Sequence, residues 1–372
     1  MEERFAGGSA VALLRDGRAA FPAMLEAIER AERQVLLEMY WFASDRAGER
    51  FVDALCRAAA RGVEVALLYD SVGSFTSDDA IFARLRDAGA RVVEFNPIAP
   101  WRHRFRFDLL TRRDHRKILV VDERVGFTGG INIAAEWLPE EEEGRGWRDD
   151  AVRLEGPCVH ALADCFHDAW RGQQGPTLEP RRSSEAPPCG NQKVRVLGQA
   201  FFRDEREIVR AYLAQIWQAR ERVWIANSYF VPDGRVVRAL RAAAARGVDV
   251  RVIVPGTSDV EIVRHASRAV WGRLLRQGVR IFRWNGNILH AKTAVVDGIW
   301  STIGTFNLDY LSLRSNLEVN VAVRDEAFAR TVEASFERDF EKCSEVDPHD
   351  FKFRSLGDRL LEMIFYRLRK LL

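Results

Sequence analysis

The eight residues AAARGVEV at positions 58–65 return almost unchanged as AAARGVDV at positions 243–250, an offset of 185 residues. Each copy ends a segment whose apolar residues have helical spacing, and each leads into an apolar run typical of a buried strand. Gly62 and Gly247 stand where a glycine commonly ends a helix. The pattern therefore predicts a unit of helix, turn and strand that the chain contains twice.

The sequence around both copies extends the repeat to the order helix, strand, helix, strand. The expected ranges are 18–32, 35–42, 48–61 and 63–69 in the first copy, and 205–220, 223–231, a helix ending at Arg246, and 248–254 in the second. We therefore expect an α/β protein of two similar domains, each a mixed sheet flanked by helices, packed with pseudo-twofold symmetry.

The stretch GQQGPTLEPRRSSEAPPCGNQ between the copies is rich in Pro, Gly and Ser and has no apolar periodicity, so it reads as a linker. The predicted division is a first domain at 1–171, a linker at 172–192, a second domain at 193–346 and a basic amphipathic helix at 347–372.

A chemical motif also occurs twice, with the spacing H-x-K-x4-D. Its residues are His115, Lys117 and Asp122 in the first copy, and His290, Lys292 and Asp297 in the second. The match continues downstream, because Gly129 and Gly304 each follow the histidine by 14 residues, and Asn132 and Asn307 by 17. Two such motifs in register with a duplication are not coincidence.

Lysine is rare in this chain. Only six of its 56 basic residues are lysines, and two of the six stand in these motifs. Because arginine serves at nearly every other cationic position, the motif positions require a compact ammonium group. The remaining histidines (103, 160, 167, 265 and 349) lack such a context and are expected to be core or edge residues.

In a strand, the histidine and lysine of each motif point to the same face, whereas the aspartate points to the other. A lysine supplies a point charge for an anionic oxygen, and a neutral imidazole can attack or transfer protons. One copy would form half a site. Two copies brought together would place His115 and His290 on opposite sides of a phosphate, with both lysines, Asn132 and Asn307 around its oxygens.

These paired motifs resemble the HKD signature of the phospholipase D superfamily, over about residues 8–345. Further segments resemble bacterial cardiolipin synthases, most closely the type B enzymes without transmembrane helices. They are LEMYWFASDRAGERFVDAL, RRDHRKILVVDERVGFTGGINI, WRDDAVRLEGP, NSYFVPD and RSNLEVNVAV. The resemblance implies a phospholipase D-like fold and a double displacement through a phosphohistidine, with no metal or other cofactor.

The resemblance also implies a carboxylate behind each histidine, and Asp149 and Glu318 occupy the matching positions. Asp149 could instead be a surface acid beside Asp150. All six motif residues are candidate catalytic residues, although Asp122 and Asp297 look structural and are expected to fix the turn after their strand. The usual order in the family makes His115 the nucleophile and His290 the general acid and base, and the reverse stays open.

The motifs indicate phosphodiester chemistry but leave the substrate open between a lipid and a nucleic acid. The formal net charge of +2 excludes the uniformly basic surface of a generic nucleic-acid coat. Residues 101–117, WRHRFRFDLLTRRDHRK, interleave basic and aromatic side chains in an insertion of about ten residues relative to the second copy. Such a segment suits an anionic lipid surface or a nucleic-acid strand, or is simply a solvated loop.

The C-terminal residues 351–372 favour the lipid. They carry a net charge of +4 and apolar side chains at helical spacing, as in a helix that lies in a membrane interface. The alternative is a helix docked on the core or on a second subunit. The chain lacks an apolar run of the ~18 residues that span a bilayer, and we expect neither a signal peptide nor a transmembrane helix.

Together these features predict a cardiolipin synthase that joins two phosphatidylglycerol molecules into cardiolipin and glycerol. It would bind anionic phospholipid and no nucleic acid, and would lie peripherally on the cytoplasmic side of the bacterial inner membrane, attached through residues 351–372 and 101–117. Five sparse cysteines without a CxxC pair agree with a reducing compartment. The alternatives are a phospholipase D-type phosphodiesterase or nuclease and, from another class, a non-enzymatic lipid-binding scaffold. Phosphatidylethanolamine as donor, hydrolysis in place of transfer, and the oligomeric state stay open.

Overall fold

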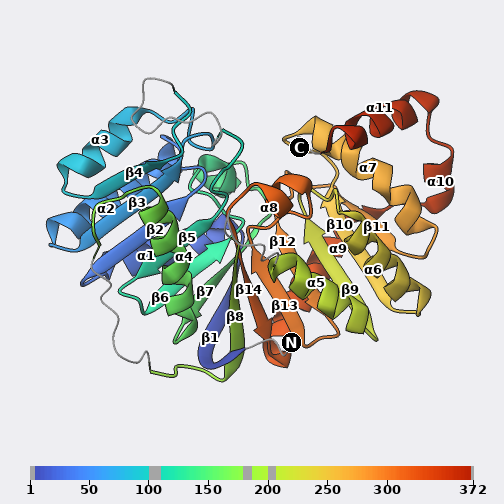
Figure 1. Cartoon of the computed structure of the whole chain (residues 1–372), viewed down its shortest axis with the longest axis horizontal. Coiled ribbons are helices and arrows are strands. Elements are labelled where there is room, and N and C mark those ends of the chain that lie inside the picture. Colours follow the sequence, from blue (N-terminus) through green and yellow to red (C-terminus); the bar gives the residue numbers. More distant parts are fainter. Residues whose placement is uncertain (1–4, 100–109, 179–186, 200–206, 370–372) are drawn as a thin grey trace.

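The computed structural model describes residues 5–99, 110–178, 187–199 and 207–369. Within these residues the strands follow the order β15-β11-β10-β9-β12-β13-β14-β8-β1-β7-β6-β5-β2-β3-β4 (Figure 1). Apart from the edge strand β15, this order reads the same from either end, with β1 matching β8, β2 matching β9, and so on. The duplication in the sequence is therefore a duplication of topology.

The N-terminal half contains the following elements: β1 (Ala6–Arg15), α1 (Asp16–Glu29), β2 (Gln34–Met39), α2 (Arg46–Ala60), β3 (Glu64–Asp70), α3 (Asp79–Asp87), β4 (Arg91–Phe95), β5 (Lys117–Val121), β6 (Val125–Gly129), β7 (Asp150–Glu155) and α4 (Cys158–Gly172).

The C-terminal half contains β8 (Gln192–Gln199), α5 (Glu207–Gln218), β9 (Arg222–Asn227), α6 (Gly234–Ala245), β10 (Asp249–Pro255), α7 (Glu261–Leu275), β11 (Arg280–Trp284), β12 (Lys292–Val296), β13 (Trp300–Gly304), α8 (Tyr310–Arg314), β14 (Glu318–Arg324), α9 (Glu326–Phe340), β15 (Cys343–Glu345), α10 (Pro348–Lys352) and α11 (Leu356–Arg367).

The predicted α/β class with a mixed sheet is confirmed. Strands β2, β3 and β4 are parallel, as are β9, β10 and β11, whereas β5 and β12 run antiparallel to β2 and β9. The register places Lys117 opposite Met39 and Lys292 opposite Asn227, at the ends of β2 and β9. The two motifs therefore occupy equivalent places in the two halves.

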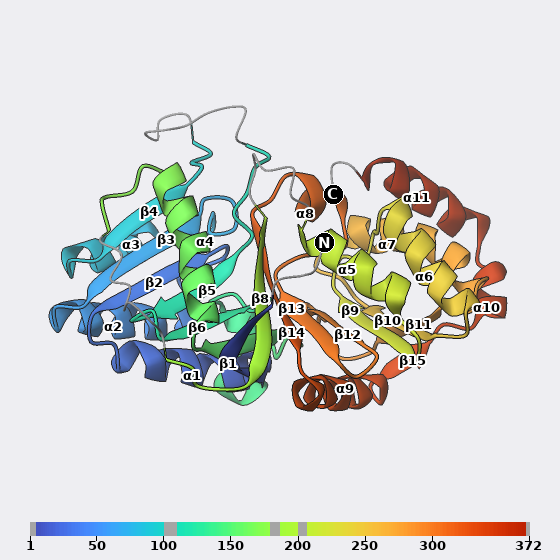
Figure 2. The same ribbon diagram turned by 60° about the horizontal axis from the view of Figure 1, so that its bottom comes forward.

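The buried apolar residues divide into three main clusters that correspond to the helix layers. Helices α1, α2 and α3 pack on the N-terminal strands, and α5, α6 and α7 on the C-terminal strands. The remaining cluster combines residues of α4 and α9 with strands of both halves, and β13 contacts β6 and β7. Figure 2 shows α4 across the N-terminal strands and α5 and α6 over the C-terminal ones. The halves therefore share a core where they meet.

The chain crosses between the halves after α4 ends at Gly172, and it enters β8 at Gln192. Part of the predicted linker, residues 179–186, lies outside the described residues. At the seam β1 and β8 pair at only two registered positions, Ala6 with Val194 and Ser9 with Gln192. The division into domains at 1–171 and 193–346 remains our proposal.

The prediction of one helix at 347–372 is wrong, because two helices occupy this segment. Asp347 accepts a hydrogen bond from the backbone N–H of His349 and caps α10, which begins at Pro348. Ser355 then caps α11 by accepting a bond from the N–H of Asp358 at 3.0 Å. These two caps favour two starts in place of one continuous helix.

Candidate active site

His115 lies where the chain enters β5, and it is held by the C-terminal half. Its backbone N–H donates to the Leu317 carbonyl at 3.1 Å, and its Nδ1 lies 3.1 Å from both carboxylate oxygens of Glu318. Glu318 is the first residue of β14 and is fully buried. The carboxylate partner of the first histidine therefore comes from the other half of the chain.

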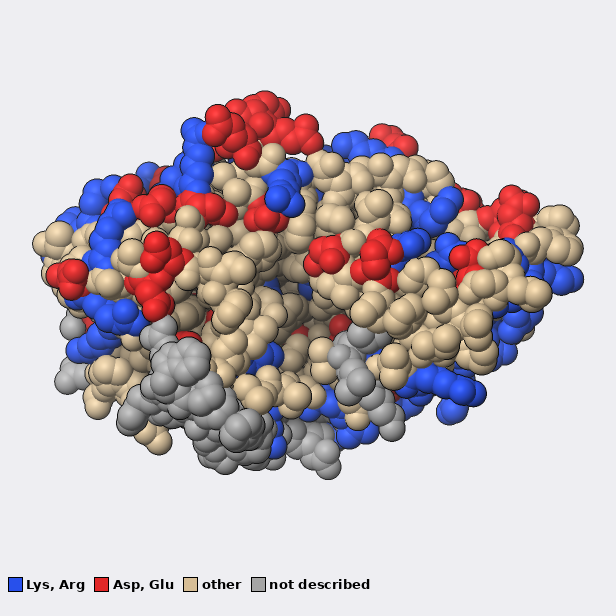
Figure 3. All heavy atoms as spheres, turned by 90° about the horizontal axis from the view of Figure 1, so that it is seen from above, with Lys and Arg blue, Asp and Glu red and all other residues tan. Residues whose placement is uncertain are grey.

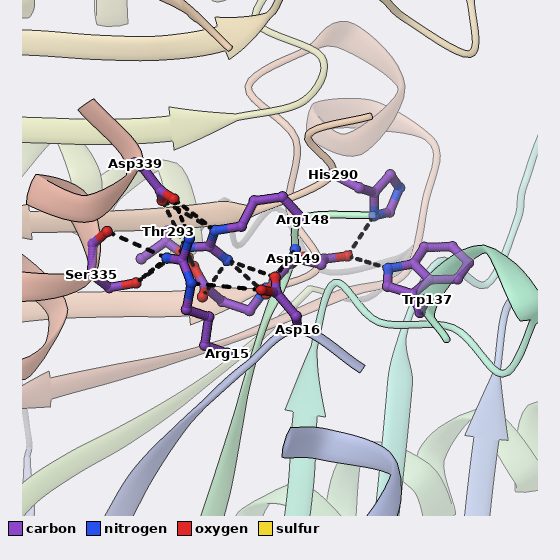
Figure 4. Close-up of polar contacts among 10 residues, drawn as sticks. Arg15, Asp16, Trp137, Arg148, Asp149, His290, Thr293, Ser335 and Asp339 are labelled. Carbon is purple, nitrogen blue, oxygen red and sulfur yellow. Dashed lines mark hydrogen bonds and ion pairs between the residues drawn. The ribbon is translucent and has the colours of Figure 1, made fainter. Parts of the chain in front are cut away.

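His290 has the matching arrangement in the opposite direction. Its backbone N–H donates to the Arg148 carbonyl at 2.7 Å, and its Nδ1 lies 2.7 Å from Asp149 Oδ2. Figure 4 shows the Asp149 carboxylate between the His290 ring and the indole of Trp137. Each motif histidine is thus paired with a carboxylate of the other half, so neither half alone holds its own motif histidine in this way.

The repeat explains why these two acids are equivalent. Ala151 pairs with Gly129 between β6 and β7, and Asn320 pairs with Gly304 between β13 and β14. Asp149 and Glu318 each stand two residues before that paired position. Asp149 is fully buried, so the alternative of a surface acid is wrong.

The surroundings of each carboxylate fix its orientation. Glu318 accepts hydrogen bonds from the hydroxyls of Thr305 and Ser312, the latter at 2.7 Å. Asp149 accepts from Trp137 Nε1 at 2.9 Å and from the backbone N–H of Asp150 at 2.8 Å. A carboxylate at Nδ1 keeps a proton on that nitrogen and leaves the lone pair of Nε2 free, the tautomer that a nucleophile or base requires.

The two motif lysines are also buried, with Lys292 at 0% exposure and Lys117 at 2%. Lys117 Nζ donates to the His115 carbonyl at 2.7 Å and lies 5.0 Å from the centre of the Tyr40 ring. Lys292 Nζ donates to Ser228 Oγ at 2.8 Å and to the His290 carbonyl. Each ammonium therefore lies beside its own histidine, as the spacing predicted.

Asn132 and Asn307 lie nearby, and each uses its side-chain oxygen within the protein. Asn132 Oδ1 accepts from the Trp41 backbone N–H at 3.1 Å, and Asn307 Oδ1 accepts from Ser228 Oγ at 2.8 Å. Within the part of the chain that the structure describes, neither Nδ2 group donates to a protein acceptor. Both are therefore available as donors to a bound anion.

Burial and the paired charges shift the protonation of the site. Burial lowers the pKa of His115, with a further contribution from Lys117, and burial and then Lys292 lower the pKa of His290 well below its usual value. Burial raises the pKa of Asp149 to about 6, whereas the pKa of Glu318 is lowered because His115 and its hydrogen bonds outweigh burial. Both histidines are therefore neutral near pH 7, and both carboxylates are largely ionised.

The lysines have unusually low pKa values for ammonium groups. Burial lowers the pKa of Lys117 to about 7 and that of Lys292 to about 8, against the raising effect of Glu318 and Asp149 respectively. A bound anion stabilises the charged form of such a buried lysine, because it replaces the interaction with water that burial removes.

Asp122 and Asp297 lie outside this cluster, which corrects their inclusion among the candidate catalytic residues. Asp122 accepts hydrogen bonds from the backbone N–H groups of residues 32–34, where the chain enters β2. Asp297 accepts the matching bonds from residues 220–222, where the chain enters β9. Both side chains fix the start of the neighbouring strand, and not the turn after their own strand as predicted.

Several side chains around the histidines were not found from the sequence. Ser228 links Lys292 to Asn307, and Tyr40 lies edge-on to the His115 ring at a centroid distance of 5.0 Å. Trp137 and Trp147 lie 5.3 and 5.9 Å from the His290 ring. A tyrosine lies edge-on to the other histidine as well, since Tyr229 lies 6.3 Å from the His290 ring, but neither tyrosine belongs to the repeated motif, so the motif spacing did not point to them.

No group of three or more His, Cys, Asp or Glu side chains in the described ranges is placed to hold a metal ion. Across the same ranges, the helices are all too short or too polar to cross a membrane.

The face of the molecule at the top of Figure 1 is hollowed near its middle, and charged side chains lie inside the hollow (Figure 3).

Comparison with known proteins finds similar sequences over nearly the whole chain. The family model described as "Cardiolipin synthase, PLD-like domain" matches residues 24–144 and 212–340. Three similar proteins are a probable cardiolipin synthase, YwiE, of Bacillus subtilis, cardiolipin synthase A of Pseudomonas putida and a cardiolipin synthase of Geobacillus thermodenitrificans. They are 33%, 37% and 34% identical over 95%, 95% and 98% of this chain and 70%, 74% and 72% of their own lengths, respectively.

Among solved structures, a phosphatidylserine synthase of Haemophilus influenzae aligns with a TM-score of 0.75 at 14% identity, over 97% of this chain and 95% of its own. A polyphosphate kinase of Porphyromonas gingivalis aligns with a TM-score of 0.58 at 16% identity, over 88% of this chain and 50% of its own. At these identities the likeness concerns the fold alone.

Proposed function

The chain belongs to the cardiolipin synthase family of phospholipase D-like proteins, and from this membership we propose that it transfers a phosphatidyl group between two phosphatidylglycerol molecules. The products are cardiolipin and glycerol. The observation that carries the proposal is the pair of buried histidines, each held by a carboxylate of the other half and flanked by a buried lysine. The narrower resemblance to type B enzymes stays a prediction.

The proposed reaction has two displacement steps at phosphorus. First, Nε2 of His115 bonds to phosphorus while the P–O bond to the glycerol headgroup breaks, and Nε2 of His290 gives its proton to the leaving oxygen. Then His290 takes the proton from a hydroxyl of the second phosphatidylglycerol, whose oxygen attacks phosphorus and releases His115. Both lysines and the free Nδ2 groups of Asn132 and Asn307 would stabilise the charge on the phosphoryl oxygens.

The protonation states allow either histidine to be the nucleophile, because both are neutral in the free site. A neutral imidazole is needed for attack, and the pKa values of both histidines are lowered. His290 must be protonated to act as the general acid. A phosphodiester anion bound between the two lysines would favour this protonated form. Trapping labelled phosphate during turnover tests the assignment: label on His115 supports it, and label on His290 reverses the two roles.

Incubation of the purified chain with phosphatidylglycerol vesicles tests the function itself. We expect cardiolipin and free glycerol, and loss of both products in His115→Ala and in His290→Ala. A lipid-binding scaffold would give no product with the unaltered chain. Cleavage of single-stranded DNA without any lipid product would contradict the proposal and favour the nuclease alternative. Parallel vesicles of phosphatidylethanolamine distinguish the donor, and phosphatidic acid would reveal hydrolysis.

We also propose that α11 seats the protein on an anionic membrane surface. The face of α11 that packs inward contains Glu362, which is 1% exposed and pairs with Arg268 and Arg354 at 3.0 and 2.8 Å. Phe365 and Tyr366 pack beside it on residues around α7. Docking through these groups leaves most of the leucine face of α11 without a partner.

The outward face of this helix is apolar. The exposed side chains are Phe353, Leu356, Leu360, Leu361, Met363, Ile364 and Leu368, with fractional exposures between 42% and 81%. Lys352, Arg359 and Arg367 are also exposed in this segment, and Figure 3 shows a wide uncharged surface on the side where α11 lies. Apolar side chains flanked by cations suit the interface of an anionic bilayer. Residues 101–109 of the other predicted membrane segment, and 370–372 of this one, lie outside the described residues. In the described part of the 101–117 segment, Arg113, Arg116 and Lys117 are buried, so these cations do not face a membrane.

The test is a double substitution, Leu361→Glu with Ile364→Glu, because deletion from Phe351 onward would remove a buried core residue. Losing two half-exposed apolar contacts is worth roughly 2 kcal/mol, or about a 30-fold weaker partition onto phosphatidylglycerol vesicles. Ile299→Glu is the matched control, since Ile299 is 42% exposed, like Leu361, but lies in the turn between β12 and β13. Equal sedimentation of the double variant and the unaltered chain would refute the proposal.

The site of action is proposed to be the cytoplasmic leaflet of the bacterial inner membrane, with peripheral attachment. All five cysteines are free thiols in the structure, which agrees with a reducing compartment. Fractionation of cells under low and high salt would test it, because an interfacial helix with cations should release partly at high ionic strength.

A further inference from the structure

Arg148 distinguishes the two halves at the site. Its carbonyl accepts the backbone N–H of His290, and in the other half the carbonyl of Leu317 accepts that of His115. The isolated bridges pair Arg148 with Leu289 and Leu317 with Asp114, which identifies Arg148 and Leu317 as equivalent. Because leucine suffices for the backbone contact, the guanidinium has a further role in one half only.

The guanidinium is buried, with Arg148 only 3% exposed, and it is surrounded by acceptors (Figure 4). Its hydrogen bonds run from Nε to both oxygens of Asp339, from Nη1 to the Asp149 carbonyl, Asp150 Oδ1 and Asp16 Oδ1, and from Nη2 to Asp150 Oδ2, Asp339 Oδ2 and Ser335 Oγ. The five N–H donors of an arginine can satisfy these acceptors, whereas the three donors of a lysine cannot.

These bonds fix the main chain that carries the Asp149 carboxylate. Arg148 Nη1 donates to the Asp149 carbonyl at 2.6 Å, and the backbone N–H of Asp16 donates to the same oxygen at 2.9 Å. The Asp149 N–H donates in turn to Asp16 Oδ1 at 3.0 Å. The peptide groups on both sides of Asp149 are therefore tied down next to His290.

The same cluster joins the two halves. Asp339 and Ser335 belong to α9 of the C-terminal half, and both also bind Arg15 at the end of β1. Asp150 accepts from Thr293 Oγ1 at 2.7 Å, one residue after Lys292. Arg148 thus links the Asp149 segment of one half to the α9 and β12 elements of the other.

We propose that Arg148 is a positioning residue that acts through Asp149 to hold the His290 ring at its working place. It contacts neither the substrate nor the reacting atoms. Its loss would move the carboxylate relative to Nδ1 of His290, and the step in which His290 transfers a proton would slow. The substrate would still bind, because the lysines and asparagines around the phosphate stay in place.

The first test compares Arg148→Lys with Arg15→Lys. Both arginines bind Asp339 and Ser335, but Arg15 touches neither Asp149 nor His290 and reaches the Asp149 segment only through a 3.6 Å ion pair with Asp16. We expect Arg148→Lys to lower kcat by about 10- to 100-fold, as a small misplacement of a catalytic group does, with KM little changed. Arg15→Lys should keep kcat. Equal losses of kcat in both variants, tracking their melting temperatures, would reduce the cluster to a structural clamp and overturn the proposal.

The second test is independent of lipid turnover, so it stands even if the proposed reaction is wrong. The titration midpoint of His290, followed by NMR of histidine-labelled protein and assigned with His290→Gln, should move in Arg148→Lys toward its value in Asp149→Ala. Arg148→Lys added to Asp149→Ala should then cause no further shift. An unchanged His290 midpoint in a folded Arg148→Lys variant would overturn the proposal.

Discussion

Replacement of Glu318 by glutamine tests the crossed pairing most sharply, because it keeps the shape of the side chain and removes its charge. Glutamine can still accept the Nδ1–H of His115 through its carbonyl oxygen, but its amide group now faces the hydroxyl of either Thr305 or Ser312. The variant loses the anion that stabilises positive charge on His115 as it bonds to phosphorus. A hydrogen bond to a charged group is worth about 1.5–3 kcal/mol. We therefore expect kcat to fall by about 10- to 100-fold.

The assay is the initial rate of cardiolipin formation on phosphatidylglycerol vesicles, with thermal unfolding measured in parallel. Glu123→Gln is the matched control, because Glu123 is 3% exposed and lies 3.0 Å from Nδ1 of His160, a buried acid of a histidine pair away from the site. That variant should keep its kcat. If Glu318→Gln retained kcat within about threefold, the charge of Glu318 would not assist His115, and the reasoning from the crossed pairs would fail.

Further predictions concern the motif lysines and aspartates. Lys117→Arg and Lys292→Arg should each lower kcat at least about tenfold, because a guanidinium fork does not fit a cavity shaped for an ammonium; full activity in both would contradict this, with product rates as the measurement. The affinity for inorganic phosphate, measured by calorimetry, should fall by up to about tenfold per pH unit for each lysine above its pKa, about 7 for Lys117 and about 8 for Lys292; a constant affinity from pH 6 to 9 would contradict the buried cations. The lowered lysine pKa values also predict that the free energy of unfolding rises between about pH 7 and pH 10, where the unfolded chain binds more protons, and that Lys292→Met removes part of this rise in urea titrations. Asp297→Ala, which loses three backbone hydrogen bonds, should lower the free energy of unfolding by about 2–3 kcal/mol at unchanged kcat; a loss of kcat in the folded variant would return Asp297 to the catalytic set.

The sequence predicted the repeated topology because a strong local signal marks it. Gly62 and Gly247 each have a φ near +85° to +90°, a conformation that few other residues adopt, and each ends a helix before a strand. The spacing of His115 and Lys117 likewise placed both side chains at one strand end. Such features depend on a few neighbouring residues, so the chain itself reveals them.

The crossed pairs could not be predicted in the same way. Glu318 lies 203 residues from His115 and Asp149 lies 141 residues from His290, and either acid could have served either histidine as far as spacing shows. The packing of the two halves against each other decides which acid serves which histidine, through the backbone contacts of Leu317 and Arg148. Those contacts arise only when both sheets are packed.

The C-terminal segment illustrates a second limit. Its apolar spacing favoured an interfacial helix, but a helix docked by its leucines has the same pattern. Glu362, which turns inward to meet Arg268 and Arg354, directs the leucines outward, so they do not dock on the core of the same chain, and a membrane stays our proposal for their partner. An ion pair between distant elements leaves no local signature in the sequence.

We propose that two histidines, supplied by the two halves, transfer a phosphatidyl group in one shared site. Quantifying cardiolipin and free glycerol after incubation of the purified chain with phosphatidylglycerol vesicles tests it most directly. We expect the two products in equal amounts from the unaltered chain, and neither product from His115→Ala or His290→Ala. Cardiolipin formation that persists in either variant, or release of glycerol with phosphatidic acid and no cardiolipin, would contradict it.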